Sequence, residues 1–428
     1  MSWVPKTDAG TAAMLKTIGV ATTEGVFDSM PPELRLKSWN VPAGISEMAV
    51  RAECAKLAAR NDAGGVCFLG GGYYDHFIPA AVDALSSRGE FYTAYTPYQP
   101  EAAQGTLQSI YEYQSAICRL TEMEYANASL YDGGTAVFEA ATMSMRIIGR
   151  SRIVCHGSLN PTYRAMLDTH TANLEIEIVT GDDPAGAACV IVQNPAFDGS
   201  IRDFTELGKR CHEAGALLVV SFYPISLGLL KTPGEMGADI AVAEGQSLGI
   251  PLNFGGPYLG ILATRKSHVR KMPGRLCAET HDAEGRRGFV LTLQAREQHI
   301  RREKAMSNIC SNQALCALRA LIYMSLMGKD GFRDVAKQCH AKSEYLKGIM
   351  RFATPLNTAP TFNEFAVRLP KNAEIAADAL RKQGWLAGLP LASVGAGGPN
   401  DLLIAVTEKR TREELDQFAS ALEKAACS

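Results

Sequence analysis

The feature that most constrains the fold of this chain is a regular alternation of apolar runs and amphipathic segments after residue 151. The expected elements are strands at 152–155, 174–179, 189–193 and 217–220, with helices at 161–169 and 204–214. Helical crossovers between successive strands build a mainly parallel sheet that is covered by helices on both faces. Such sheets bind ligands at the carboxyl ends of their strands. We therefore expect a large α/β domain with its site at that edge.

A second constraining stretch, residues 239–264, follows this alternation directly. The apolar run from Ile240 to Ala243 is expected to be a buried strand, and Tyr258 to Thr264 a second strand. Polar residues and glycines separate the two. No lysine occurs between Lys231 and Lys266. Taken alone, the stretch is equally compatible with a glycine-rich surface loop in a Rossmann-like enzyme.

Length and charge set the class of protein. A chain of 428 residues, 46% of them hydrophobic, has material for one large domain and a smaller one. A formal net charge of -2 gives no reason to expect nucleic acid or an anionic membrane surface as a partner. The N-terminus lacks the apolar core of a signal peptide, and the longest apolar run, 216–230, is interrupted by serines and a proline. We expect a cytoplasmic protein without a membrane span.

Cysteines and histidines point to neither disulfides nor a metal. The eleven cysteines contain no CxxC pair, and most stand in apolar surroundings. This pattern is typical of free thiols in a reducing cytosol. The eight histidines show no HExxH or other metal-ligand spacing, so the spacing predicts no metal site.

We predict three segments along the chain. Residues 1–45 are expected to be an N-terminal arm, and Ser46 is expected to cap the helix that opens a large α/β domain at 46–328. The glycines of Gly328-Lys-Asp-Gly331 mark a boundary. After it, helices and strands alternate again, which predicts a small C-terminal α+β domain at 329–428.

One loop is unusually rich in phenol and hydroxyl groups. It reads Phe91-Tyr-Thr-Ala-Tyr-Thr-Pro-Tyr-Gln-Pro, and its candidate ligand-binding residues are Thr93, Tyr95, Tyr98 and Gln99. Such groups orient a carboxylate or a phosphate without titrating at neutral pH. The alternative is an aromatic loop that packs on its neighbour.

Two further segments are candidates for anion binding. The turn Gly133-Gly134-Thr135 opens an expected helix, and free N–H groups at a helix start favour a phosphate. Its alternative is a turn of small residues for tight packing. The second segment is the basic cluster Arg301, Arg302 and Lys304, which is either a solvated face or a contact for an anion or a partner protein.

Several motifs together resemble one family. They are Phe68-Leu-Gly-Gly-Gly-Tyr-Tyr-Asp-His, Tyr92-Thr-Ala-Tyr-Thr-Pro-Tyr-Gln-Pro-Glu, Gln108-Ser-Ile-Tyr-Glu-Tyr-Gln, Tyr131-Asp-Gly-Gly-Thr-Ala and Arg296-Glu-Gln-His-Ile-Arg-Arg-Glu-Lys-Ala. In this order they span most of the chain, which resembles glycine decarboxylase, the P-protein of the glycine cleavage system. The resemblance implies the pyridoxal-phosphate transferase fold, similar to that of aspartate aminotransferase.

The same resemblance shows that two cofactor-binding groups are missing. Matching Pro251 and Gly255-Gly256-Pro257 to members with the Schiff-base lysine places Gln246 at that lysine's position. An amide cannot condense with an aldehyde. In this fold the strand that ends near Ser221 carries the aspartate that pairs with the pyridine nitrogen, and a hydroxyl cannot supply its charge.

The resemblance therefore implies a noncatalytic α, or N-terminal-type, subunit. A homologous β subunit would hold the pyridoxal phosphate covalently, in an αβ pair that is doubled to α2β2, with no cofactor expected on this chain alone. The assembled glycine dehydrogenase (aminomethyl-transferring) decarboxylates glycine and passes the aminomethyl group to the lipoyl arm of the H-protein. The hydroxyl-rich loop would form part of the partner's active-site wall, the Gly133 turn would be vestigial, and the basic cluster would contact the partner or the H-protein.

Two alternatives remain open from the sequence. One is an autonomous pyridoxal enzyme that uses another lysine, such as Lys231 or Lys266. The other is a binding or scaffold protein without any enzymatic association.

Overall fold

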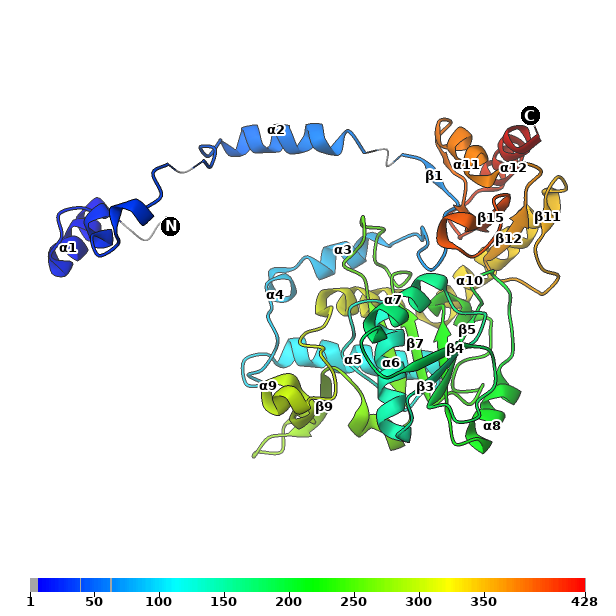
Figure 1. Cartoon of the computed structure of the whole chain (residues 1–428), viewed down its shortest axis with the longest axis horizontal. Helices are drawn as coiled ribbons and strands as arrows, with labels where there is room; N and C mark the ends of the chain where they lie inside the picture. Colours follow the sequence, from blue (N-terminus) through cyan, green and yellow to red (C-terminus); the bar gives the residue numbers. More distant parts are fainter. Residues whose placement is uncertain (1–6, 39, 62–63, 428) are drawn as a thin grey trace. The chain divides into compact units, whose positions relative to one another are not determined.

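A computed structural model describes residues 7–38, 40–61 and 64–427 of the chain (Figure 1). By their internal packing, the residues divide into two compact units, Met1–Ala63 and Gly64–Ser428. This division does not test the three segments predicted from the sequence, which stay a prediction.

The first unit contains two helices, α1 (Asp8–Ile18) and α2 (Glu47–Ala58), and short 3₁₀ turns at Glu24–Phe27 and Pro32–Leu34. The predicted cap of α2 is confirmed, because the Ser46 hydroxyl accepts a hydrogen bond from the amide of Ala49 at 3.3 Å. None of the described residues in this unit is buried. The described residues of the first unit therefore form no buried core.

The second unit is built on a seven-stranded sheet, which confirms the predicted mainly parallel arrangement. Its order is β2-β8-β7-β6-β5-β3-β4. The strands are β2 (Tyr125–Ala126), β3 (Arg152–Cys155), β4 (Glu177–Thr180), β5 (Cys189–Asn194), β6 (Leu217–Phe222), β7 (Ile240–Glu244) and β8 (Gly260–Thr264). Strands β3 to β7 pair in parallel, and β8 runs antiparallel to both β7 and β2.

Helices cover both faces of this sheet because its strands are apolar on both sides. Alternate residues of one strand enter different cores: Val190 packs with one cluster and Ile191 with the other. The first core contains residues of α5 (Gln104–Thr121), α8 (Thr205–Glu213) and α10 (Ala314–Ile349). The second contains residues of α6 (Gly133–Ile148) and α7 (Pro161–Thr171), two helices that lie in front of the sheet in the view of Figure 1.

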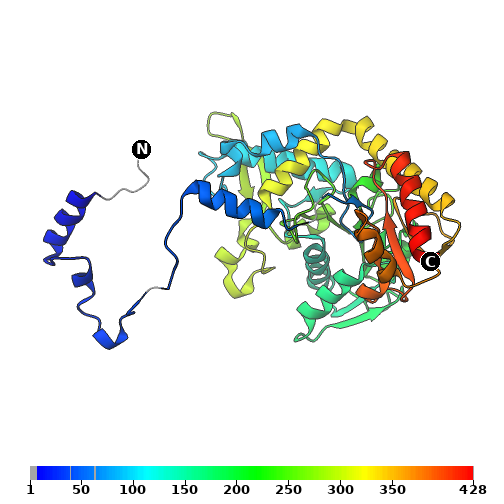
Figure 2. The same ribbon diagram turned by 90° about the horizontal axis from the view of Figure 1, so that it is seen from above.

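The C-terminal part is an α+β layer, seen at one end of the body in Figure 2. Its antiparallel sheet has the order β11-β12-β15-β14 and is packed against α11 (Ala373–Arg381) and α12 (Arg412–Cys427). These strands are β11 (Thr354–Pro355), β12 (Glu364–Arg368), β14 (Leu389–Pro390) and β15 (Asp401–Ala405). At the predicted boundary, α10 is broken by the non-helical backbone of Gly328.

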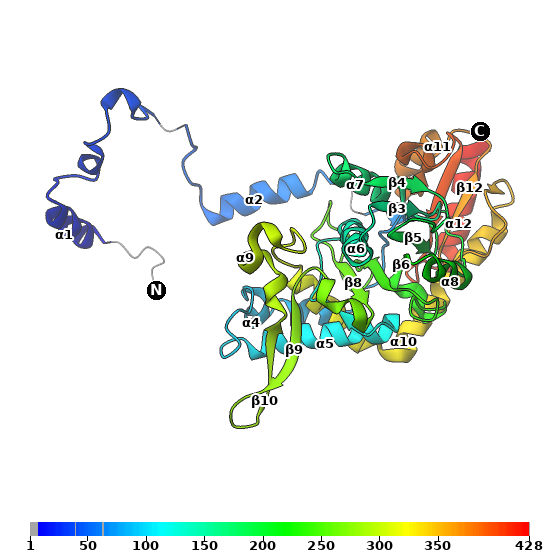
Figure 3. The same ribbon diagram turned by 60° about the horizontal axis from the view of Figure 1, so that its bottom comes forward.

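Shorter elements complete the second unit. Strand β1 (Val66–Cys67) pairs in parallel with β13 (Trp385–Leu386), which ties the start of this unit to its C-terminal part. Helices α3 (Ala80–Ser86), α4 (Gly89–Tyr92) and α9 (Gln298–Arg301) are short. Strands β9 (Leu276–His281) and β10 (Arg287–Thr292) form a hairpin that projects from the body in Figure 3, where the sequence predicted only a polar stretch. Within the described ranges, no helix has the length and apolarity to cross a bilayer.

Candidate active site

A small cavity lies at the carboxyl ends of three neighbouring strands. Gln193 of β5, Ser221 of β6 and Glu244 of β7 line it, together with Tyr163 of α7 and Glu364 of β12. This is the edge at which the parallel sheet predicts a ligand site. The volume of the cavity is about 30 Å³, which is close to the room that one water molecule occupies in the liquid.

The amide of Gln246, at the predicted lysine position, is buried and is hydrogen-bonded through both its oxygen and its nitrogen. Its oxygen accepts from the amide of Tyr74 at 2.9 Å. Its nitrogen donates to the carbonyl oxygens of Tyr74 at 3.1 Å and of Ile250 at 2.8 Å. The side chain therefore links the loop before α3 to the turn after β7, and both of its N–H donors are used within the chain.

The carboxyl group of Glu244 occupies the start of helix α6. One oxygen accepts from the amide of Gly133 at 3.0 Å, and the other accepts from the amides of Gln246 at 2.9 Å and Leu259 at 3.2 Å. Burial raises the pKa of this carboxyl group to about 8, against the opposing effect of the N–H donors. The place that the sequence predicts for a phosphate is thus filled by a side chain of the same chain.

The turn Gly133-Gly134-Thr135 is also closed by packing. Asp132 caps the helix by accepting from the amide and the hydroxyl of Thr135 at 2.8 and 3.0 Å. A Cβ atom on Gly133 would lie 2.5 Å from the hydroxyl of Tyr163, and one on Gly134 would lie 2.2 Å from the sulfur of Met166. A Cβ on Gly133 would also lie 2.9 Å from the backbone nitrogen of Glu244, so Gly133 is required by tight packing, whereas the flexible side chain of Met166 can move away from Gly134.

A second acid, Glu364, lies on the opposite wall of the cavity, and the sequence analysis missed it. It accepts from the amide of Gly71 at 2.6 Å and from the hydroxyl of Tyr74 at 2.9 Å. Burial raises its pKa to about 7. A Cβ on Gly70 would lie 1.9 Å from its carboxylate oxygen, so the glycine triplet at 70–72 allows this close approach. In the sequence, the glycine triplet was the one feature that indicated a buried group packed closely against the backbone.

The hydroxyl-rich loop is exposed, in contrast to the cavity. Tyr95 is 84% exposed, and Thr93 bonds only to the backbone of Gly89. Gln99 is exposed as well. A separate pocket of about 160 Å³ lies under the loop, between the starts of α5 and α10, and it shares no lining residue with the small cavity.

Tyr98 is held in place by an arginine that the sequence analysis did not single out. The guanidinium of Arg275 donates to the hydroxyl of Tyr98 at 3.0 Å and lies 5.5 Å from the centre of its ring. Arg275 is buried, and it also donates to the carbonyl oxygen of Cys310 at 2.7 Å. No local pattern marks this arginine, because its partners are distant in the sequence.

His299, which lies two residues before the basic cluster, contacts this loop. The imidazole of His299 lies edge-on to the ring of Tyr98, with ring centres 5.8 Å apart. Arg301 donates to the carbonyl oxygen of Ala295 at 3.0 Å. The side chains of Arg302 and Lys304 are exposed, and no ion pair joins either of them to another described residue.

The match to known proteins covers almost the whole chain. The family model of the glycine cleavage system P-protein matches residues 1–422. The chain belongs to the glycine cleavage system P-protein family. A P-protein relative from Geotalea uraniireducens, named probable glycine dehydrogenase (decarboxylating) subunit 1, is 52% identical over 442 residues, 99% of this chain and 100% of the relative. A relative of the same name from Maridesulfovibrio salexigens is 51% identical over 440 residues, 99% of each.

Solved structures agree with this family. The crystal structure of an inhibitor-bound glycine decarboxylase (P-protein) superposes with a TM-score of 0.93 at 41% identity, covering 99% of this chain and 100% of that one. An aspartate aminotransferase from Thermus thermophilus superposes with a TM-score of 0.56 at 16% identity, covering 84% of this chain and 98% of that one. The predicted pyridoxal-phosphate transferase fold is confirmed.

The residues of this P-protein chain do not fit pyridoxal phosphate. Pockets for ligands of drug or cofactor size enclose roughly 300–1,000 Å³, far more than the cavity beside Ser221. The start of α6 holds the carboxyl group of Glu244 in place of a phosphate. Neither Lys231 nor Lys266 lines the cavity, and the amine of Lys231 donates to Asp203 and Thr205.

Proposed function

We propose that this chain is the noncatalytic α subunit of glycine dehydrogenase (aminomethyl-transferring). In that assembly glycine loses its carboxyl group as carbon dioxide, and the aminomethyl group passes to the lipoyl arm of the H-protein. Membership of the P-protein family supports the activity, and the name subunit 1 of the relatives supports a separate partner chain. We further propose that both chains act in the cytoplasm.

The observation that carries the noncatalytic role is the closed cavity. Gln246 replaces an amine by an amide whose two N–H groups both donate within the chain, and Glu244 fills the phosphate position. These contacts support a cofactor that is held on a lysine of the homologous β subunit. The resemblance to the P-protein family implies an αβ pair that is doubled to α2β2, and we propose that assembly.

This chain would serve the partner's site with its exposed loop. Tyr98 is fixed by Arg275, whereas Tyr95 extends into solvent and is free to reach a neighbouring chain. Thr93 and Gln99 flank these two tyrosines on the same loop. Arg301, Arg302 and Lys304 add an exposed positive charge nearby, which suits a contact with the β subunit or with the H-protein.

The test is reductive labelling with borohydride, which fixes pyridoxal phosphate covalently to the lysine that holds it. The chain is incubated with the cofactor alone, and then together with its β subunit, and the labelled peptides are mapped. We expect no label on the chain alone and a label only on the β subunit in the mixture. A stoichiometric label on one lysine of this chain would contradict the proposal and favour an autonomous enzyme.

Absence of a partner would contradict the proposal in another way. If the β subunit and this chain did not copurify, and if glycine decarboxylation by the β subunit were the same with and without this chain, the scaffold alternative would hold.

A further inference from the structure

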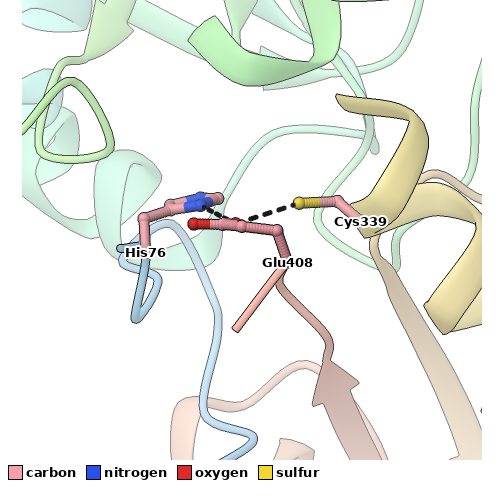
Figure 4. A group of neighbouring side chains, drawn as sticks. All are labelled: His76, Cys339 and Glu408. Carbon is pink, nitrogen blue, oxygen red and sulfur yellow. Dashed lines mark hydrogen bonds and ion pairs between the residues drawn. The ribbon is translucent and has the colours of Figure 1, made fainter. Parts of the chain in front are cut away.

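Three side chains of types that can bind a metal ion meet in one place, although they are far apart in the sequence (Figure 4). His76 lies in the loop before α3, Cys339 in α10 and Glu408 in the loop after β15. The first and last of these are 332 residues apart. Their donor atoms all lie within 4.8 Å of one another.

The carboxylate of Glu408 lies between the other two groups. One of its oxygens is 2.7 Å from Nδ1 of His76 and 3.4 Å from the sulfur of Cys339. In a tetrahedral zinc site with bonds of about 2.0–2.3 Å, donor atoms are about 3.4 Å apart. The oxygen and the sulfur are already at that separation, and a withdrawal of the imidazole by roughly half an ångström brings Nδ1 to it from the oxygen. The third separation, between Nδ1 and the sulfur, lies within 4.8 Å, so the side chains of His76 and Cys339 have to close around the ion.

Groups outside the triad hold two of these donors in the orientation that coordination requires. Nε2 of His76 is hydrogen-bonded to the hydroxyl of Tyr223, and Nδ1 is hydrogen-bonded to the carboxylate of Glu408. In the tautomer whose Nε2–H donates to Tyr223, the lone pair of Nδ1 faces the group, and an ion would replace the hydrogen bond between Nδ1 and Glu408. The second oxygen of Glu408 accepts from the amide of Phe77 at 2.7 Å, which turns the first oxygen toward the imidazole and the thiol. Contacts of this kind accompany the ligands of metal sites.

Burial and charge are also consistent with a cation. His76 and Cys339 are buried, and the side chain of Glu408 is 10% exposed. A neutral imidazole, a thiolate and a carboxylate together carry two negative charges, of which the nearby ammonium group of Lys342 offsets a part, so the group keeps a net negative charge that attracts a cation. The nearby amine of Lys342 is bonded to the backbone oxygen of Glu408 and does not occupy the centre of the group.

We propose that His76, Cys339 and Glu408 form a binding site for one Zn²⁺ ion. Nitrogen, sulfur and carboxylate donors are the set that zinc prefers, and three protein ligands leave the fourth position to water. Binding releases the thiol proton of Cys339 to solvent, because the thiolate is the ligand. The ion joins the loop before α3, helix α10 and the segment after β15, so its role is to fix the C-terminal layer to the large sheet domain.

Without an ion the same groups form a hydrogen-bonded cluster, and the two interpretations predict different results. The full chain is dialysed against a chelator, transferred to metal-free buffer and titrated with Co²⁺, which replaces zinc and absorbs light when a thiolate coordinates it. We expect one Co²⁺ per chain, a thiolate-to-cobalt charge-transfer band in the near ultraviolet, and displacement of that band by one equivalent of Zn²⁺. We also expect Zn²⁺ to raise the melting temperature.

Matched variants assign the site. Cys339→Ala should abolish the band and weaken Co²⁺ binding by more than about 100-fold, since even outer contacts of metal ligands are worth about 10–100-fold. Tyr223→Phe should retain the band and weaken binding by about 10-fold. Cys211→Ala removes another buried thiol, on α8, and should change neither value.

Two results would overturn the proposal. One is a wild-type chain that takes up no stoichiometric Co²⁺, a measurement that does not depend on the folding of any variant. The other is an equal band in the wild type and in Cys339→Ala, which would place the ion elsewhere.

Discussion

The closed cavity and the exposed loop have changed in opposite ways relative to a pyridoxal enzyme. Ser221 and Glu244 line the cavity, Gln246 follows Glu244 by two residues, and all three are buried. Glu244 and Gln246 are held by hydrogen bonds within the chain. On the loop, Tyr95 and Gln99 are exposed and have few internal contacts. The interior groups contact one another, while the surface groups are available to another molecule.

The physical requirements on the cavity and on the loop differ, because one is buried and the other is exposed. A buried polar group needs a partner, so a vacated cofactor site has to be refilled from within the chain. Glu244 and Gln246 do this at the two most polar positions. An exposed loop has no such requirement, because water satisfies it. Its tyrosines therefore need another explanation, and contact with the β subunit provides one.

The largest expected effect is that of returning the missing amine, Gln246→Lys. An ammonium group donates but cannot accept, so the amide of Tyr74 would lose its partner in a buried place. We expect the free energy of unfolding to fall by about 3 kcal/mol, and no covalent pyridoxal phosphate to appear after borohydride reduction. Denaturant unfolding and peptide mapping measure the two effects.

The uncharged variant Gln246→Met is the matched control for this change. It removes the same hydrogen bonds without burying a charge. It therefore separates the cost of the lost hydrogen bonds from the cost of a buried ammonium group. If Gln246→Lys bound the cofactor covalently and lost no stability, the cavity would not be closed in solution, and the comparison with the loop would fail.

The sequence was sufficient for the architecture. Apolar runs separated by amphipathic helices predicted β3 to β8 in order, and Gly328 marked the break in α10. These features depend on local periodicity and on the special backbone of glycine, which the sequence displays directly. The β9–β10 hairpin was missed because its strands are polar on one face and stand in a charged stretch.

The candidate site was only half predictable, for a physical reason. The missing aspartate at Ser221 and the missing lysine at Gln246 follow from the family's motifs. The side chains that fill the cavity come from elsewhere in the chain. Glu244 bonds to a residue 111 positions away, and Glu364 to one 293 positions away. No periodicity or spacing reports on contacts of that length. Arg275 and the cluster at His76 were missed for the same reason.

The second prediction concerns pH. Burial raises the pKa of Glu244 from its usual 4.5 to about 8, so between these values the folded chain holds a proton that the unfolded chain has lost. The stabilising proton is fully present below the unfolded value and is lost as the pH rises through the folded one. We expect the free energy of unfolding to decrease by roughly 2 kcal/mol between about pH 6 and about pH 8.

The variant Glu244→Gln should make that pH profile flatter, because an amide does not titrate in this range. Replacing the exposed Glu413 on α12 by glutamine is the matched control and should leave the slope unchanged. Equal slopes in the wild type and in Glu244→Gln would show that Glu244 is ionised in the folded chain, and the cavity would then contain a buried anion in place of a neutral acid.

The smallest expected effect is on the loop and appears only in the assembled enzyme. Tyr95→Phe removes a hydroxyl that is exposed in this chain and has no hydrogen bond to a described residue, so the stability of the chain should not change. If that hydroxyl bonds to substrate or to the partner's site, kcat/KM for glycine decarboxylation should fall by about 10-fold, which corresponds to one hydrogen bond of about 1.4 kcal/mol.

Tyr98→Phe should lower both activity and stability, because Arg275 loses an acceptor. Tyr125→Phe, an exposed tyrosine on β2, should alter neither. Full activity in both loop variants would mean that the loop merely packs on a neighbour, and the contrast with the cavity would then lie in exposure alone.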